Sequence, residues 1–160
     1  MNKLDEILSA ISRKDVMALK KLTPTDVNVR DQDGMTLLMN AILENADPSI
    51  VRLLIERGAD INASDSIQKW TALHFAARDQ NKQIVSILLE AGANVDPTDV
   101  FGNTPLWRSV MNSTSNIDVI KDLAAHGADP YRKNNYGNAP IDIARETGRA
   151  DIVAIFESES

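Results

Sequence analysis

An internal repeat constrains the fold of this chain more than any other feature of the sequence. The matching segments are DGMTLLMNAI (33–42), KWTALHFAA (69–77), FGNTPLWRSV (101–110) and YGNAPIDIA (136–144). Their equivalent positions are Thr36, Thr71, Thr104 and Ala139, so successive copies are offset by 35, 33 and 35 residues. A period of this length predicts a stack of similar supersecondary units, not a fold around one central core.

Within each copy, the residue types predict two helices. In the third copy, Thr104 can cap the first helix through its hydroxyl, and Pro105 suits the first helical position, where a missing N–H costs nothing. The second helical segments carry an apolar stripe that one copy cannot bury alone, and stacking of neighbouring copies would bury it. These segments all end in a glycine suited to a left-handed helix end: IVRLLIERG (50–58), IVSILLEAG (84–92) and VIKDLAAHG (119–127).

The Thr-Pro-Leu opening and the period together resemble the ankyrin-repeat family, from about residue 26 to the C-terminus. The resemblance implies an all-α ankyrin solenoid of about five helix pairs, with three well-formed repeats between degenerate caps. It is similar to small, free-standing bacterial members of the family. We expect a single domain over 1–160, divided into an N-terminal cap (1–30), full repeats (31–64, 65–98 and 99–133) and a C-terminal cap (134–160).

Composition excludes several other classes of protein. The 160 residues include no cysteine, which rules out disulfides, thiolate zinc sites and a cysteine nucleophile. A formal net charge of −6 argues against nucleic acid as a partner, because duplex binding needs a basic footprint. No apolar run approaches the roughly 18 residues of a membrane span, and the N-terminus lacks a signal peptide's apolar stretch. We therefore expect a cytoplasmic protein with no membrane partner, monomeric when unbound.

The two histidines, His74 and His126, are the first candidates for a metal ligand or a catalytic base. The ankyrin resemblance implies a structural, hydrogen-bonding role for His74. Other copies carry Met39, Trp107 and Asp142 at that position, so no row of like ligands forms. His126 is expected at a helix C-terminus, where a charged imidazole suits the helix dipole. Without a third ligand, a nucleophile motif or a phosphate-binding loop, the sequence predicts no enzyme, no cofactor and no metal.

The positions that stacking leaves free are the candidates for function. In the resembling family these are the loop tips before each helix pair and the exposed end of the first helix, which line a concave face. The resemblance implies that partner-binding residues occupy these positions here: Asp33, Met35, Glu44, Gln68, Trp70, Arg78, Asp79, Phe101, Asn103, Met111, Asn112, Tyr136 and Asn138.

Aromatic residues mark the expected tips. Trp70, Phe101 and Tyr136 fall in consecutive tips, and partner anchors are enriched in such residues. The alternative is that these side chains lean on the neighbouring tip and only stabilise the loops. Trp107, which replaces the structural histidine, is expected to be buried. Lys69 stands where other copies have glycine, and one residue is inserted before it, so we expect this tip to differ in backbone conformation.

The sequence thus predicts a non-catalytic module that binds one protein partner through its concave face and loop tips. The acids on that face favour a partner with a basic surface. Two roles remain open. One is an immunity or inhibitor protein that neutralises a toxin domain, by analogy with small bacterial ankyrin proteins, and the other is an adaptor or regulatory subunit that scaffolds a cellular enzyme. An enzyme of unrecognised type would require a convergent, titratable pocket.

Overall fold

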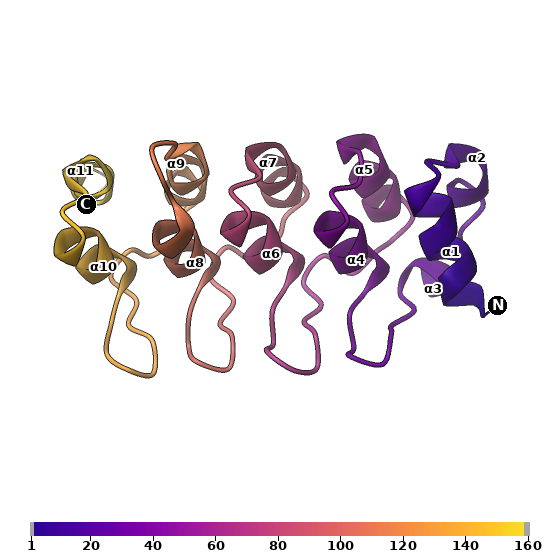
Figure 1. Ribbon diagram of the computed structural model, residues 1–160, viewed down its shortest axis with the longest axis horizontal. Coiled ribbons are helices and arrows are strands. Elements are labelled where there is room, and N and C mark those ends of the chain that lie inside the picture. Colours follow the sequence, from indigo (N-terminus) through magenta and orange to yellow (C-terminus); the bar gives the residue numbers. More distant parts are fainter. Residues whose placement is uncertain (1, 159–160) are drawn as a thin grey trace.

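Helix pairs stand side by side in a row, and a loop projects from one side of the row before each of the last four pairs (Figure 1). The computed structural model describes residues 2–158, and the all-α solenoid expected from the repeats is confirmed. The helices of this range are α1 (Lys3–Ser12), α2 (Val16–Leu19), α3 (Pro24–Val27), α4 (Leu37–Leu43), α5 (Pro48–Glu56), α6 (Ala72–Arg78), α7 (Lys82–Glu90), α8 (Pro105–Asn112), α9 (Asp118–Ala125), α10 (Pro140–Glu146) and α11 (Ala150–Ser158).

The pairs are α1 with α2, α4 with α5, α6 with α7, α8 with α9 and α10 with α11. The short helix α3 follows the first pair and was not predicted. The first helices of the pairs form a middle layer between the second helices and the projecting loops (Figure 1). No helix within residues 2–158 is long and apolar enough to cross a membrane.

The first helices of the repeats begin at side chains that satisfy exposed backbone N–H groups. Thr36 and Thr104 accept from the N–H three residues on, at 3.3 and 3.2 Å, and Pro105 takes the first helical position as expected. Ala139 has no hydroxyl to offer at this place. There the carboxylate of Asp142 accepts from the Ala139 N–H at 2.9 Å, so the last repeat keeps half of the capping arrangement.

The second helices bury the same face in every repeat, which is why one repeat cannot be stable alone. This face joins the first helices in one continuous apolar core, in which α6 packs against α4, α7 and α8. Burial of each large aliphatic side chain contributes about 1.5–3 kcal/mol. The buried residues of this face, none more than 2% exposed, are Ile50, Val51, Leu54, Ile84, Val85, Leu88, Val119, Ile120, Leu123, Ile152 and Phe156.

Two glycines show different reasons for lacking a side chain. Gly92 follows α7 with φ of 87°, as expected for a helix end, and a Cβ there would meet no atom within 4 Å. A side chain at Gly92 would therefore cost free energy through backbone conformation alone. Gly34, with φ of 75°, lies in a loop tip, and a Cβ there would collide with the side chain of Ser66 in the next tip. Gly34 permits the close approach of two tips.

Candidate protein-binding face

Each loop tip is closed from within by an aspartate or an asparagine. In three tips, one side-chain oxygen accepts from the N–H groups two and four residues further on; the residue is Asp31, Asp99 or Asn134. Asp65 serves the longer second tip, in which its two carboxylate oxygens accept three N–H groups at 2.7 or 2.8 Å. Sequence reasoning missed this motif, although an Asp or Asn stands five or six residues before each helix cap.

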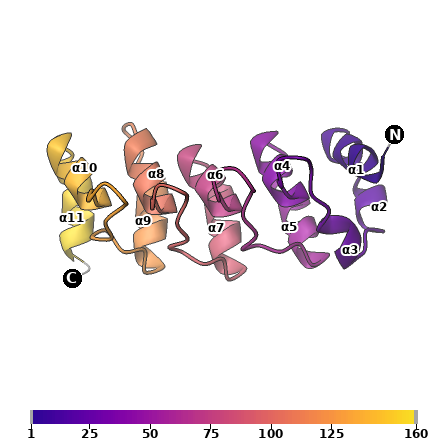
Figure 2. The same cartoon turned by 90° about the horizontal axis from the view of Figure 1, so that it is seen from below.

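Hydrogen bonds between neighbours join the tips into one row. Ser66 N–H donates to Asp33 O at 3.0 Å, Val100 N–H to Gln68 O at 3.0 Å, and Asn135 N–H to Phe101 O at 2.9 Å. Seen from below, the tips follow one another along the four helix pairs from α4 to α11 (Figure 2). The side chains at the tips therefore stand on a backbone that is fixed before any partner arrives.

Lys69 keeps the left-handed backbone of the glycines it replaces. Its φ is 61°, close to the 75° of Gly34 and the 78° of Gly102. The tip differs from the others, as expected, but not at Lys69 itself. The extra residue of this tip is accommodated earlier, where Asp65 accepts from the adjacent N–H groups of Ile67 and Gln68.

Trp70 is buried, only 6% exposed, so the prediction that it is an exposed partner anchor is wrong. Its ring stacks on His74 with centroids 5.9 Å apart and an interplanar angle of 21°. The guanidinium carbons of Arg78 and Arg108 lie 5.3 and 4.7 Å from its centroid. Trp70 thus holds α6 and α8 together through aromatic and cation–π contacts.

The position of Trp70 relative to the helix explains that error. Trp70 directly precedes the residue that caps its helix, whereas Phe101 and Tyr136 stand three residues before theirs. The Trp70 side chain, next to the cap, is buried against the helices, and the Phe101 and Tyr136 side chains, at the turns of their tips, are exposed. The three aromatics are therefore in consecutive tips but not at equivalent places.

Asn103 occupies the place equivalent to Trp70 and is also buried, at 4% exposure. Its side-chain oxygen accepts from Asn134 Nδ2 at 2.8 Å, and its backbone oxygen is 3.1 Å from His74 Nε2. The prediction that Asn103 contacts a partner is wrong, because its polar groups already join one repeat to the next. Trp107, expected to be buried, is only half-buried, although its indole N–H is enclosed without a partner.

His74 has the structural role expected of it. Thr71 N–H donates to His74 Nδ1 at 3.1 Å, so Nδ1 must be an acceptor and Nε2 carries the proton that bonds to Asn103 O. Burial lowers the pKa of His74 to about 4, which keeps the ring neutral. His126 ends α9, where its Nδ1 bonds to Asp122 O at 2.8 Å.

Most of the other expected partner residues do reach the surface. Met35 and Arg78 are half-buried, and those exposed are Asp33, Glu44, Gln68, Asp79, Phe101, Met111, Asn112, Tyr136 and Asn138. Four large apolar side chains at the turns of three consecutive tips form what we name the tip strip: Ile67, Val100, Phe101 and Tyr136, with exposures of 63, 44, 43 and 71%. Phe101 and Tyr136 also contact each other, with centroids 6.4 Å apart, so support of a neighbouring tip and exposure to a partner coexist.

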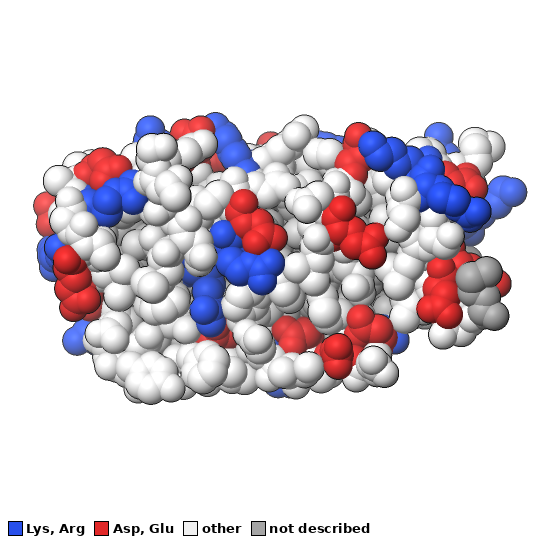
Figure 3. Space-filling view, viewed as in Figure 1, with Lys and Arg blue, Asp and Glu red and all other residues white. Residues whose placement is uncertain are grey.

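The side of the molecule that carries the loop tips has an acidic half and a mostly uncharged half. In Figure 3, acidic side chains gather along the lower edge below α4 and α6, whereas the lower edge below α8 and α10 is mostly uncharged. Arg78 and Asp79 neutralise each other through two hydrogen bonds of 2.7 and 3.1 Å. Glu44 accepts only a neutral hydroxyl, from Ser12 at 3.0 Å. The acidic half of the face therefore keeps uncompensated charge.

A buried ion pair lies behind this face. Arg108 binds Asp99, whose side chain is fully buried. Burial alone would raise the pKa of Asp99, but the Arg108 guanidinium and the backbone N–H groups of Asn103 and Phe101 outweigh it and lower the pKa. Asp99 thus stays charged, closes the third tip and anchors the arginine that covers Trp70.

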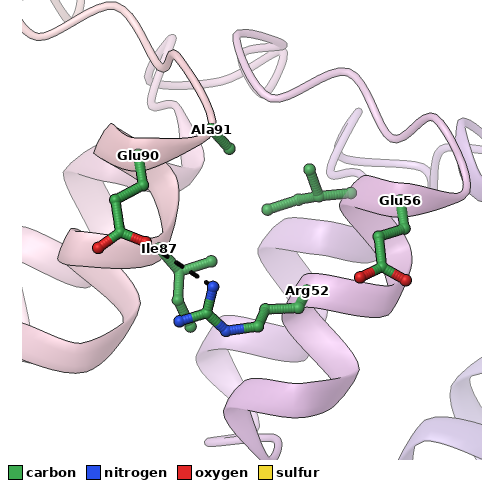
Figure 4. A pocket seen from close by; sticks show the side chains of 6 residues that line it. Arg52, Glu56, Ile87, Glu90 and Ala91 are labelled. Carbon is green, nitrogen blue, oxygen red and sulfur yellow. Dashed lines mark ion pairs between the residues drawn. The ribbon is translucent and has the colours of Figure 1, made fainter.

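An open groove of about 280 Å³ lies between the second helices α5 and α7, away from the tips (Figure 4). Arg52 and Glu90 face each other across it at 3.8 Å, and both side chains are more than half exposed. An exposed pair of this kind contributes little stability. Residues 2–158 contain no group of three or more His, Asp or Glu side chains that could hold a metal ion. The tips therefore remain the candidate site.

The row of stacked helix pairs places this chain in the class of solenoid repeat proteins. A family model described as ankyrin repeats (3 copies) matches residues 7–99 and again residues 42–134. The chain belongs to the ankyrin-repeat family, as its sequence predicts, and ankyrin repeats are protein–protein interaction modules.

Similar curated proteins come from viruses and animals. The chain is 34% identical over 160 residues to a putative ankyrin repeat protein of fowlpox virus (strain NVSL), covering 95% of this chain and 46% of the viral protein. It is 29% identical over 152 residues to the tyrosine-protein kinase Shark of Drosophila melanogaster, covering 94% and 16%. It is 28% identical over 147 residues to the mitochondrial disaggregase of Bos taurus, covering 88% and 21%. The chain spans less than half the length of these relatives.

Proposed function

We propose that the tip strip and the acids beside it bind one protein partner that presents an apolar patch within a basic surface. The observation that carries this proposal is the exposure of Ile67, Val100, Phe101 and Tyr136 on loops that neighbouring tips hold in place. Apolar side chains on a fixed backbone lose little conformational entropy on binding, which favours affinity. Aromatic anchors at the centre of an interface often dominate its binding energy.

The charge at the acidic end of the row sets the expected nature of the partner. Asp33 and Glu44 are exposed there, and neither carboxylate forms an ion pair with the residues that the structure describes. Acids around an apolar centre accelerate the approach of a basic protein and disfavour an acidic one. Asp79 adds less to this field than its sequence position suggests, because Arg78 neutralises it.

Two roles fit a non-catalytic, cytoplasmic module of this kind. The relatives include a kinase and a disaggregase, in which the matching segment is a minor part of a longer chain, and this favours an adaptor or regulatory role. The inhibitor role, in which the module neutralises a toxin domain, requires that binding abolish the partner's activity. An adaptor leaves that activity intact and a regulatory subunit adjusts it without abolishing it, so an assay of the purified complex separates the two roles.

Capture from host extract tests the binding site directly. The baits are the unaltered chain, a Phe101→Ala/Tyr136→Ala variant and a Met17→Ala control, since Met17 is 68% exposed on α2 outside the tips. We expect at least one protein to be retained by the unaltered chain and the control but lost from the double variant. Equal retention by all three folded baits would show that the tip strip is not the site.

A further inference from the structure

A small pocket opens between the first two tips, beside α6. Met35, Trp70 and Phe75 supply apolar walls, and Asp33, Asp65 and Arg78 supply charged groups. Its volume is about 180 Å³. Sites for small molecules and cofactors usually have volumes of about 300–1,000 Å³, so this pocket suits one side chain of a larger partner.

The apolar walls are fixed before binding. Trp70 and Phe75 are 6 and 8% exposed, and their ring centroids are 5.0 Å apart at an interplanar angle of 59°. Arg78 lies over both rings, and Arg108 lies over Trp70. Met35, half-buried and unbranched, is the wall that can adapt to an occupant.

The charged groups of the pocket differ in whether they already have hydrogen-bond or ion-pair partners. Asp65 accepts three backbone N–H groups of its own tip. Arg78 is held by both carboxylate oxygens of Asp79. Asp33 is exposed, and its carboxylate has no hydrogen bond or ion pair to any residue in the described range 2–158. The charged group at the rim that has no partner is therefore the negative carboxylate of Asp33.

We infer that this pocket, here named the tip pocket, accepts one long basic side chain, lysine or arginine, from the partner. The aliphatic stem packs on Met35, Trp70 and Phe75, and the cationic head pairs with Asp33. The head binds the carboxylate and not the indole face, because guanidinium groups already lie over Trp70. This inference rests on the proposed function and names the chemistry of one contact within it.

A displayed library of random twelve-residue peptides is the probe, because a preformed pocket for one side chain needs no folded partner. Peptides selected on the full chain are expected to share a lysine or arginine, and alanine in its place is expected to weaken binding at least tenfold. On an Asp33→Asn chain the same alanine substitution is expected to have less than a threefold effect. The Glu44→Gln chain removes an equal charge from the same side and is expected to retain the tenfold effect.

Three results would overturn the inference: no binding peptide, binders without a shared basic residue, or an equal alanine effect on the Asp33→Asn and unaltered chains. Each of these leaves the proposed function standing if the captured partner still requires Phe101 and Tyr136. If the captured partner does not require Phe101 and Tyr136 but the alanine effect still depends on Asp33, the binding face would instead be assigned to the acidic tips.

Discussion

Asp96 accepts a hydrogen bond from Asp129 N–H at 3.0 Å through one carboxylate oxygen, and its second oxygen is buried without a partner. The equivalent residues of the two preceding repeats are asparagines, Asn28 and Asn62, which accept the matching N–H in the same way. Asn28 also donates through its amide to Gly58 O at 2.8 Å. An ionised carboxylate at this place can accept the first hydrogen bond but has no proton to donate for the second.

Asp96→Asn is expected to stabilise the protein by about 1 kcal/mol at neutral pH, because an amide can satisfy the buried site without charge. Burial raises the pKa of Asp96, so its ionised form is disfavoured in the folded state, and the stability it costs grows as pH rises through that pKa. Urea denaturation of both proteins measures the difference. A lower midpoint for Asp96→Asn would show that the carboxylate has a partner that we have not identified.

Stability is expected to fall between about pH 6.5 and pH 4 because of His74. Burial lowers its pKa from 6.5 to about 4, so in this window the unfolded state binds the proton and the folded state does not. The expected loss is about 2 kcal/mol from about pH 7 to pH 5. Denaturation of the unaltered chain and of a His74→Gln variant over this range tests it. The variant cannot titrate at this position and should show a flatter dependence; parallel curves would assign the loss to other groups.

Trp70→Ala is expected to destabilise the protein by about 3–5 kcal/mol, as is typical when a buried aromatic side chain is truncated. The loss removes the contacts with His74, Arg78 and Arg108 that link two repeats. Tyr136→Ala, at a side chain 71% exposed, is the matched control and should change stability by less than about 0.5 kcal/mol. Thermal melts followed by circular dichroism compare them. Equal melting temperatures would mean that Trp70 is not buried in solution.

Gly92→Val is expected to cost more than about 1 kcal/mol, because a β-branched residue is poorly tolerated at φ of 87°. Space is not the reason, since no atom lies within 4 Å of a Cβ at this place. Gly92→Asn should therefore cost less, because asparagine adopts the left-handed conformation more readily. Chemical denaturation of the two variants gives the ranking. Equal costs would point to a steric effect that the structure does not show.

The features that recur in every copy could be predicted from the sequence. The prediction of exposed residues was wrong at places where one copy differs from the others. The period, the helix caps at Thr36 and Thr104 and the glycines after α5, α7 and α9 follow from local chemistry, and the structure confirms them. Trp70 and Asn103 were wrongly predicted to be exposed. Both residues stand directly before the helix cap, two positions after the exposed turn of the tip, and the prediction treated the two places as equivalent. Which of these places faces outward depends on contacts between repeats.

The charges on the face also could not be predicted from the sequence. Nothing local indicates that Arg78 pairs with Asp79, since neighbouring residues on a helix do not usually face each other. The local sequence also does not indicate that Arg108 pairs with Asp99 in the preceding tip. Nor does the local sequence indicate that the carboxylate of Asp33 has no ion pair within the residues that the structure describes. The aspartate or asparagine that closes each tip recurs five or six residues before each cap and could have been found by alignment of the copies.

The dissociation rate of the complex with the captured partner is the most direct test of binding through the tip strip. Phe101→Ala/Tyr136→Ala should raise this rate at least tenfold, because truncated anchors act on dissociation. The circular-dichroism spectrum should stay unchanged, and the melting temperature should fall only slightly through the lost contact between the two rings. Asp33→Lys should instead slow association at about 50 mM salt, with little effect at about 500 mM. If both variants bind as the unaltered chain does, and substitution of Arg52 or Glu90 in the groove between α5 and α7 weakens binding, the partner does not bind at the tips.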